Sequence, residues 1–219
     1  MKYLREFETE ADITIDAYPN VILVNDTKSV FYNYVPKGVF IQHIDGSLYS
    51  VDEWGAAGYS NDLANGVAVS TDNARFVIAK TSLGTMAWSS NTSTLVDGIL
   101  TTTDSNVAKT DFAGYENTQL MLATDTSKAG YSCANYTFPN GDKGYLPALG
   151  EWNEAYKNKA AINAAMTAIG GDTIPTSYHW SSTQYSAIFA WYLHWNDGTT
   201  YDSTKDTNFD VRAFSALKL

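Results

Sequence analysis

Residues 178–219 combine two kinds of position that no single periodic pattern accounts for. One kind is aromatic, small or basic, and we interpret these residues as a structural framework. They are Trp180, Ser181, Ser182, Thr183, Ala190, Trp191, Leu193, Trp195, Gly198, Lys205, Val211 and Arg212. The positions between them hold Tyr, Ser, Ala, Ile, Phe, His, Asp, Thr and Asn in no regular order. This arrangement predicts a rigid β framework with a surface whose positions tolerate many different side chains. Such a surface is typical of a recognition module and not of an enzyme.

The composition narrows the classes of partner and compartment. The chain has 219 residues, 44% of them hydrophobic, which is enough to bury the core of one domain. A net charge of −10 and the lack of a Lys/Arg run argue against nucleic acid and anionic membranes as partners. Cys133 is the only cysteine, so no disulfide framework forms within the chain. No apolar run approaches the roughly 18 residues of a membrane span, and we expect neither membrane insertion nor a signal peptide.

The chain divides at about residue 36. Residues 1–36 predict an N-terminal arm or hairpin, which we interpret as an attachment segment, although these residues could equally be the first strands of the main domain. Residues 37–219 predict a single domain. Before residue 90 the alternation of apolar and turn residues predicts strands and a short helix or loop that opens at 52. The predicted strands are 21–24, 29–34, 38–44, 48–51, 66–70 and 75–80.

The middle of the chain predicts helices joined by polar loops. Asp111 is placed to cap a helix that ends near Ala123. Its expected inward positions are Phe112, Tyr115, Leu120 and Leu122. The stretch 149–169 is expected to be helical and to stop at Gly170. Its apolar positions are Trp152, Ala155, Tyr156, Ile162, Ala165, Met166 and Ile169. Surface loops are expected at 90–110 and 125–147, and further strands at 178–184, 188–195 and 209–217.

Four motifs in the second half of the chain resemble a known family. They are GYLPALGEW at 144–152, YHWSST at 178–183, Ala190-Trp191 and Val211-Arg212. They are similar to motifs of the C-type-lectin-like domains related to formylglycine-generating enzymes, and most similar to the variable proteins of diversity-generating retroelements. The resemblance covers roughly 38–219, and the first residues resemble the leader of phage-encoded proteins that carry such domains. It implies an α+β, C-type-lectin-like fold of mixed antiparallel sheets with flanking helices.

The resemblance also implies which positions vary. In these systems a reverse transcriptase randomises adenines, so an AAC codon for Asn becomes any codon that ends in C. Such codons cannot encode Lys, Glu, Gln, Met or Trp. Between Tyr185 and Asp210 only Trp191, Trp195 and Lys205 belong to that excluded set, and we interpret them as framework. The variable region is then about 178–217, on a scaffold of Trp180, Trp191, Trp195, Gly198 and Arg212. The implied ligand-binding residues are Tyr185, Ser186, Ala187, Ile188, Phe189, Tyr192, His194, Asp197, Thr199, Tyr201, Asp202, Ser203, Thr204, Asp206, Thr207, Asn208, Phe209 and Asp210.

Motifs that could suggest calcium binding or catalysis have simpler structural interpretations. Trp195-Asn196-Asp197 matches the WND motif that ligates calcium in sugar-binding C-type lectins, but the chain has no Glu-Pro-Asn or Gln-Pro-Asp partner motif. We therefore expect a tight type I′ turn at 196–198. The catalytic relatives use a cysteine pair or several histidines. Here Cys133 stands alone and the three histidines, at 43, 179 and 194, share no short spacing, so we expect no catalytic residue, metal or cofactor.

Two acidic residues on the predicted 149–169 helix also have a simple interpretation. Glu151 and Glu154 could suggest paired catalytic carboxylates. We interpret them instead as a solvated helix face, because an acidic residue near a helix N-terminus favours the helix dipole.

The expected function is therefore ligand binding, by a hypervariable receptor-recognition or adhesion protein. The expected partner is a protein or glycan on a bacterial surface, with other virion proteins bound through the N-terminal segment and self-association as an additional option. The expected location is a virion, such as a phage tail, or the extracellular space after cytoplasmic synthesis. Two alternatives stay open. One is a metal-dependent oxidase-like relative of formylglycine-generating enzymes, and the other is a structural virion domain that binds no ligand.

Overall fold

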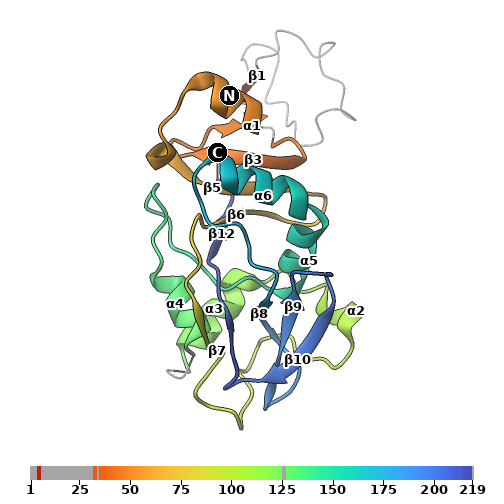
Figure 1. The fold of residues 1–219 in the computed structure, drawn as a ribbon. Coiled ribbons are helices and arrows are strands. Elements are labelled where there is room, and N and C mark those ends of the chain that lie inside the picture. The colour runs from red at the N-terminus through yellow and green to blue at the C-terminus, as the bar shows by residue number, and fades with distance from the viewer. Residues whose placement is uncertain (1–3, 6–31, 34, 125–126, 219) are drawn as a thin grey trace, which may run out of the picture.

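The structure is a computed structural model that describes residues 4–5, 32–33, 35–124 and 127–218 (Figure 1). Within these residues the fold is α+β, with two five-stranded sheets, a two-stranded pair and several helices. The two-stranded pair joins β1 (Leu4–Arg5) to β2 (Tyr32–Asn33) in antiparallel orientation. Apart from β2, the hairpin predicted at 21–24 and 29–34 lies outside the described residues.

The first sheet has the strand order β12-β6-β5-β3-β4, and all its pairs are antiparallel. Its strands are β3 (Gly38–His43), β4 (Leu48–Tyr49), β5 (Ala64–Ser70), β6 (Arg75–Ile78) and β12 (Phe214–Ala216). The strand predicted from residue 38 and the hairpin predicted at 66–80 are both confirmed. The central strand β5 is buried along its whole length, which explains its run of small and apolar side chains.

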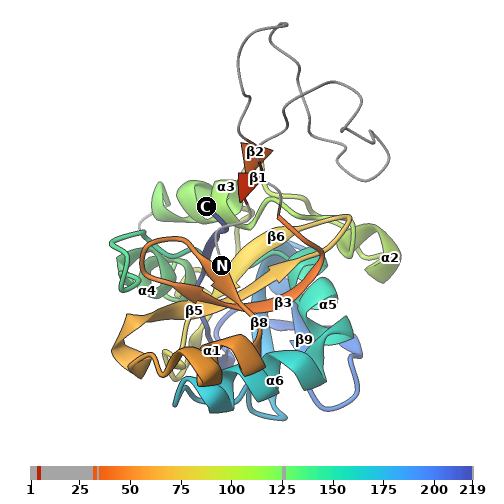
Figure 2. The same cartoon turned by 90° about the horizontal axis from the view of Figure 1, so that it is seen from above.

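Two helices cover one face of this sheet (Figure 2). The first, α1 (Val51–Ala57), begins with a capping box between Ser50 and Glu53 and ends at Gly58. The 3-10 turn η2 (Asn61–Leu63) then leads into β5. The second helix, α6 (Lys159–Ala168), packs against β3 and β5 through the apolar residues that the sequence pattern selects. Val51 was expected in a strand, but the Ser50 cap makes it the first helical residue.

The second sheet has the strand order β10-β9-β8-β11-β7. Its strands are β7 (Thr85–Ala87), β8 (Tyr178–Gln184), β9 (Phe189–His194), β10 (Thr200–Thr204) and β11 (Asn208–Asp210). Only the β8–β11 pair is parallel. The strands predicted at 178–184 and 188–195 are confirmed. Edge strand β10 was not predicted, and the strand predicted at 209–217 is two strands, β11 and β12, which belong to different sheets.

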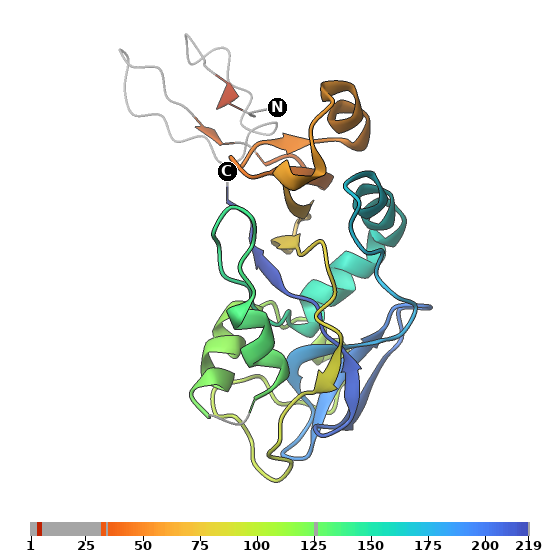
Figure 3. The same cartoon turned by 60° about the vertical axis from the view of Figure 1, so that its left-hand side comes forward.

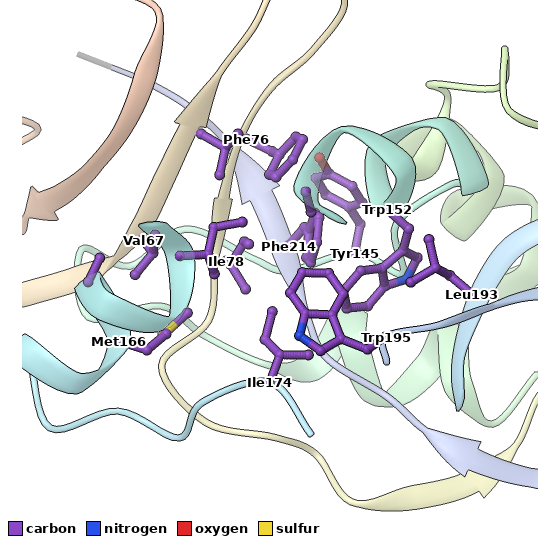
Figure 4. Packing of buried hydrophobic residues seen from close by; sticks show 14 of the residues in the cluster. Val67, Phe76, Ile78, Tyr145, Trp152, Met166, Ile174, Leu193, Trp195 and Phe214 are labelled. Atoms are coloured by element: carbon purple, nitrogen blue, oxygen red, sulfur yellow. The ribbon is translucent and has the colours of Figure 1, made fainter. Parts of the chain in front are cut away.

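The two sheets lie at opposite ends of the domain (Figure 3), and two apolar clusters, each with residues from both sheets, form the core between them. Aromatic side chains at the centre of this core join β6, β12, the helix that carries Trp152 and the end of β9 (Figure 4). The Phe214 ring lies 4.7 Å from Phe76 and 4.9 Å from Trp152, centroid to centroid. The Trp152 ring lies 5.8 Å from Trp195. Residues 38–218 therefore pack as one unit.

Two segments predicted as surface loops are largely accessible but also contribute a short helix and a few side chains to the core. The 90–110 segment contains α2 (Ser105–Ala108) and buries Val96 and Ile99. The 125–147 segment contains α4 (Ala129–Asn135), which buries Cys133. Their polar composition concealed these elements, because only a few apolar residues in each segment turn inward.

The helix predicted from Asp111 is displaced and faces another way. Helix α3 (Gly114–Leu122) begins three residues later, and Asp111 bonds the backbone N–H of Ala113 rather than capping the helix. Tyr115 is exposed and Leu122 is half-buried, whereas Leu120 packs half-buried against the second apolar cluster, so the predicted inward face was only partly right. The buried positions are Gly114, Asn117, Thr118 and Met121. The prediction failed because this face is largely polar: Asn117 donates to the Asp111 carboxylate at 2.9 Å.

The helical stretch predicted at 149–169 is two helices. Helix α5 (Leu149–Lys157) ends at Asn158, whose side chain donates to the carbonyl oxygen of Glu154 at 3.0 Å, and α6 begins at the next residue. Trp152 and Ala155 are buried as expected, as are Ile162, Ala165 and Met166 of α6 and Ile169, which follows it. Helix α5 packs on β8 and β9 and so supports the second sheet from one side.

Candidate ligand-binding surface

The scaffold residues of the second sheet are buried and tie the sheet to the loops around it. Trp180, Trp191 and Trp195 are each 4% exposed or less. The Trp180 indole N–H donates to the carbonyl oxygens of Met86 and Thr207, at 3.0 and 3.2 Å. The Trp191 indole N–H donates to the carbonyl oxygen of Thr102 at 2.9 Å. These bonds hold the sheet in one position relative to its neighbouring loops.

Lys205, which the codon argument assigns to the framework, has a buried side chain. Its ammonium group donates to the Thr94 carbonyl oxygen at 3.1 Å and to Gln184 Oε1 at 2.9 Å. It also lies 4.7 Å from the centroid of the Trp88 ring, a cation–π distance. Burial lowers the pKa of Lys205 to about 8. The residue therefore connects the β10–β11 turn to the 90–104 segment and points away from solvent.

Arg212 performs a similar role on the other side of the sheet. Its Nη1 donates to the carbonyl oxygens of Ala79 and Asp172, at 3.1 and 2.9 Å. Burial lowers the pKa of Arg212 to about 10. The guanidinium group therefore fastens the loop before β8 to the end of β6.

The turn between β9 and β10 is longer than the tight turn predicted at 196–198. His194 N donates to Thr199 O at 2.8 Å, and Gly198 N donates to His194 O at 2.9 Å, which encloses residues 195–198. Gly198 has φ +75°, and a Cβ there would lie 2.2 Å from the Tyr156 ring. This position therefore requires glycine for two reasons, its backbone conformation and the close approach of α5.

The eighteen predicted ligand-binding residues all retain contact with solvent, in contrast to the buried tryptophans. The exposed ones are Ile188, Asp197, Tyr201, Asp206 and Asn208. The half-buried ones are Tyr185, Ser186, Ala187, Phe189, Tyr192, His194, Thr199, Asp202, Ser203, Thr204, Thr207, Phe209 and Asp210. Buried and accessible positions are thus interleaved along β9, whereas the β8–β9 turn and the edge strand β10 have no buried side chain among residues 185–189 and 199–204.

The strand register brings three of the predicted ligand-binding rings together. Tyr192 on β9 is directly opposite both Tyr201 on β10 and Trp180 on β8, so these side chains share one face of the sheet. Phe209 on β11 joins them, with its ring 4.7 Å from Tyr192 and 4.7 Å from Trp180. The Tyr192 and Tyr201 rings lie 6.2 Å apart.

Tyr178 completes this group, although it was not among the predicted ligand-binding residues. Its ring lies 5.2 Å from Tyr192, 4.8 Å from His194 and 5.1 Å from Phe209, and its side chain is 43% exposed. Its spacing of two residues from Trp180 on the predicted strand was the signal that could have identified it. We call the set Tyr178, Tyr192, His194, Tyr201 and Phe209 the aromatic face.

Tyr185 and Phe189 lie apart from the aromatic face. Along β9, Phe189 alternates with Ala190 and so points to the same side as Trp191. The Tyr185 ring lies 6.1 Å from Phe189 and 5.2 Å from Trp191. The five large aromatic residues of the predicted site therefore form two groups on opposite sides of the sheet, and not one continuous patch.

Several polar residues of the predicted site are held by local hydrogen bonds. Asp197 accepts from the backbone and side chain of Thr199, at 3.0 and 2.6 Å, and contacts His194 Nδ1 at 3.0 Å. Asp210 accepts from the hydroxyl of Ser177. These contacts fix the turns that border the aromatic face. A surface of fixed rings and hydroxyls is suited to contact and hydrogen bonding with a partner.

Glu151 does not lie on a solvated helix face, which corrects the sequence prediction. It is 5% exposed, and its carboxyl group accepts from the Tyr145 hydroxyl at 2.7 Å and from Ala148 N at 2.8 Å. Glu154 is 4% exposed and pairs with Lys157 and Asn73. The two side chains are buried because α5 lies between the sheets and not on the surface. Both are held by protein donors.

The histidines lie in separate places. His179 is buried and bonds Pro175 O through Nε2, and burial lowers its pKa to about 4. His43 lies in the first sheet and His194 on the aromatic face. In the part of the chain that the structure describes, no three His, Cys, Asp or Glu side chains are grouped so that they could hold a metal ion. The described helices also include none that is long and apolar enough to cross a membrane.

Comparison with known proteins gives a fold similarity. No protein-family model matches the sequence, and no match was found among curated proteins. A solved structure with a similar fold is that of a fimbrial protein from Bacteroides ovatus, with a TM-score of 0.61 and 14% sequence identity. The match covers 84% of this chain and 49% of that chain, so this chain spans about half the length of the fimbrial protein. At this identity the similarity concerns the fold.

Proposed function

We propose that this protein is a ligand-binding protein of the receptor-recognition or adhesion class, and that its binding surface lies on the second sheet, within residues 178–210. One observation carries the proposal: the scaffold side chains Trp180, Trp191 and Trp195 are buried, whereas all eighteen candidate binding residues retain solvent contact. Substitution of exposed side chains usually changes stability by within about 0.5 kcal/mol. Such a segment can therefore change its specificity without loss of the fold.

We also propose that the fold is C-type-lectin-like and that the surface is diversified, as in the variable proteins of diversity-generating retroelements. The motif at 144–152 supports this, because Trp152 donates to the carbonyl oxygen of Trp180 at 3.0 Å and so braces the sheet from behind. The burial of Lys205 supports it too, because a Lys codon cannot arise at a diversified Asn position. A near-copy of the gene segment with AAC codons, beside a reverse-transcriptase gene, is the expected genomic signature.

The setting of the protein has two candidates. The resemblance of the sequence favours a phage virion, in which residues 1–36 attach the domain to other virion proteins. The fold similarity to a fimbrial protein favours a bacterial surface appendage. Both settings place the binding surface outside the cell and both display many copies, which raises the avidity of individually weak contacts. If no template copy accompanies the gene, the fimbrial setting is favoured and the diversification proposal is wrong.

The binding proposal is tested by capture of intact bacterial cells on beads that carry the protein. Tyr178 and Tyr201 are 43% and 55% exposed, so their joint replacement by Ser removes the most accessible rings of the aromatic face. The chain offers a matched control, the joint replacement of Tyr115 and Tyr131 by Ser, because these tyrosines are 52% and 62% exposed on other elements. We expect the first variant to lose capture of strains that wild-type protein retains, and the second to keep it. Equal capture by both variants would exclude the aromatic face as the binding surface.

A further inference from the structure

The strand register leaves the centre of the aromatic face without charge. Asp202 and Asp210 are the only Asp, Glu, Lys or Arg residues on the five strands of the second sheet. Asp202 is directly opposite Trp191, and Asp210 is directly opposite His179. Trp191 and His179 alternate along their strands with residues of the aromatic face, so both carboxylates lie on the other side of the sheet. The one group of the aromatic face that can carry a positive charge is His194, which is the last residue of β9.

A group of hydroxyls lies on the same side of the sheet as the rings. Ser203 follows Tyr201 by two residues on β10, so the two side chains point to the same side, with Cα atoms about 6.5 Å apart. The Ser203 hydroxyl donates to Thr207 Oγ1 at 3.0 Å, and the Thr204 and Thr207 hydroxyls also lie 3.0 Å apart. All three residues are half-buried and retain contact with solvent. We call Ser203, Thr204 and Thr207 the hydroxyl group of the face.

The hydroxyl group is next to the rings and has bonding capacity left over. The Thr207 carbonyl oxygen and the Phe209 ring both contact the indole of Trp180, which places the hydroxyls beside the ring of Phe209. Three hydroxyls have three protons, and the two bonds among them use two of these. One proton and several lone pairs are therefore free to bond with a ligand that both donates and accepts.

Uncharged rings beside uncharged hydroxyls match the chemistry of a neutral sugar. A sugar ring has an apolar face of C–H groups, which packs on an aromatic ring, and its hydroxyls both donate and accept. The size of the surface agrees, because β8, β9 and β10 span only about 10 Å from the first strand to the third. A standard protein interface needs about 20–30 residues on each side. The aromatic face and the hydroxyl group together have eight.

We propose that the aromatic face binds a neutral glycan. The sugar rings pack on Tyr192 and Tyr201, and the sugar hydroxyls bond with the hydroxyl group at Ser203 and Thr207. This mode differs from the calcium-dependent sugar binding considered above for residues 195–197, because protein rings and hydroxyls make all the contacts. The proposal rests on the proposed function, since it names the class of ligand bound at the same surface.

The test starts from a bacterial strain that the beads capture and compares three portions of its intact cells. One portion is oxidised with periodate, which cleaves glycans between neighbouring carbons that carry hydroxyls, and is then reduced with borohydride. A second portion is treated with a protease of broad specificity, and the third is left untreated. Labelled full-length protein is titrated onto each portion, and the half-saturating concentration is measured. We expect periodate to abolish binding.

The protease identifies the carrier of the glycan or the alternative partner. Loss of binding after periodate supports the inference whether or not the protease also removes binding, since surface glycans occur on lipids and on proteins. Binding that survives periodate overturns the inference. If the protease alone removes binding, the partner is a protein surface.

Substitutions locate the glycan on the untreated cells. Ser203→Ala and Tyr201→Ser should each raise the half-saturating concentration about 2- to 10-fold, because each removes a hydrogen bond or a ring contact. Ser132→Ala is the matched control, because Ser132 is a half-buried serine on α4, and it should leave the concentration unchanged. Equal effects of Ser203→Ala and Ser132→Ala would overturn the inference.

Salt and a calcium chelator test the uncharged nature of the contact. Raising the salt from about 0.01 M to about 0.15 M, or adding EGTA, should leave binding unchanged, because a neutral glycan forms no ion pair with the face. Strong weakening by either would overturn the inference. If the glycan is excluded but cell capture still depends on Tyr178 and Tyr201, the binding function stands. If cell capture does not depend on them, both proposals fall.

Discussion

At the scale of single residues, the Glu151 carboxyl group makes the stability of the fold depend on pH. Burial raises its pKa to about 8, from an ordinary value of 4.5, against the opposing effect of the bonds from Tyr145 and Ala148. In the folded protein the group is therefore protonated at neutral pH, whereas in the unfolded chain it is ionised. Unfolding then releases a proton, and the stability that this group contributes is complete below about pH 4.5 and is lost as the pH rises through about 8.

Glu151→Gln should remove this pH dependence. Gln mimics the protonated acid, because its oxygen can accept from Ala148 N and its amide group can donate to the Tyr145 hydroxyl. We expect the free energy of unfolding of the wild type to fall, relative to that of the variant, by about 1.4 kcal/mol per pH unit within this interval. Urea denaturation at a series of pH values between 5 and 8 measures the difference.

Glu154→Gln is the control on the same helix. The pKa of Glu154 is lowered, because its bonds to Lys157 and Asn73 outweigh the effect of burial. Its contribution to stability therefore has the opposite sign and is lost as the pH falls below the ordinary value of 4.5. A Glu151→Gln variant whose pH profile runs parallel to that of the wild type would show that Glu151 is ionised in the folded protein.

At the scale of elements, the β9–β10 hairpin depends on the contact between its turn and α5. Gly198 packs against the ring of Tyr156, so a helix of the core fixes where the hairpin turns. This contact sets the register of β10 and therefore the position of Tyr201 beside Tyr192. The arrangement of the aromatic face is thus determined in part by Tyr156, a residue of α5 outside the aromatic face.

Gly198→Ala should destabilise the protein more than Gly58→Ala. Both glycines have positive φ, +75° and +65°, but a Cβ at Gly198 would enter the Tyr156 ring, whereas a Cβ at Gly58 would meet open space. The left-handed conformation costs Ala about 1–2 kcal/mol in each variant, and the displaced ring adds about 1–3 kcal/mol at Gly198. Chemical denaturation of the two variants measures this. Equal losses would mean that Tyr156 moves aside without cost.

Elements with a clear apolar pattern were predictable, whereas elements with a polar interior were not. The strands that carry Val67 and Trp191 and the helix that carries Met166 follow from hydrophobic spacing alone. Helix α3 was misoriented because Asn117 and Asp111 face inward, and a buried polar network has no hydrophobic signature. Strand β10 was missed because it is an edge strand without a buried side chain. The predicted site proved to be two groups of rings because a polar strand has no hydrophobic pattern that tells which of its faces is covered.

At the scale of the whole molecule, the two sheets cannot come apart without exposure of their common core. Phe214 belongs to β12 of the first sheet, and Trp195 comes directly after β9 of the second sheet. Both rings nevertheless pack on Trp152. Burial of such side chains typically contributes about 1.5–3 kcal/mol each. The candidate scaffold could be assigned from the sequence because tryptophans are rare and large. The packing of both sheets on Trp152 could not be predicted, because it joins residues that are far apart in the sequence.

We expect residues 38–218 to unfold in one cooperative transition. Tryptophan fluorescence reports mainly on the second sheet and the core, since Trp180, Trp191 and Trp195 lie there, whereas far-ultraviolet circular dichroism reports on all elements. The two signals should give the same midpoint and the same slope in a urea titration. Phe214→Ala should lower the free energy of unfolding by about 3–5 kcal/mol, so both midpoints should move together to lower urea concentrations. Two separated transitions would show that the sheets are independent units.

The passage of the chain from β11 to β12 has a consequence for the design of binders on this domain. Val211, Arg212 and Ala213 cross from one sheet to the other and are 1% exposed or less. A combinatorial library built on this scaffold should therefore end at residue 210, one residue before the crossing. Randomised codons at 211–213 would give mostly unfolded members, whereas those at the accessible positions before residue 211 would sample new surfaces on an unchanged domain.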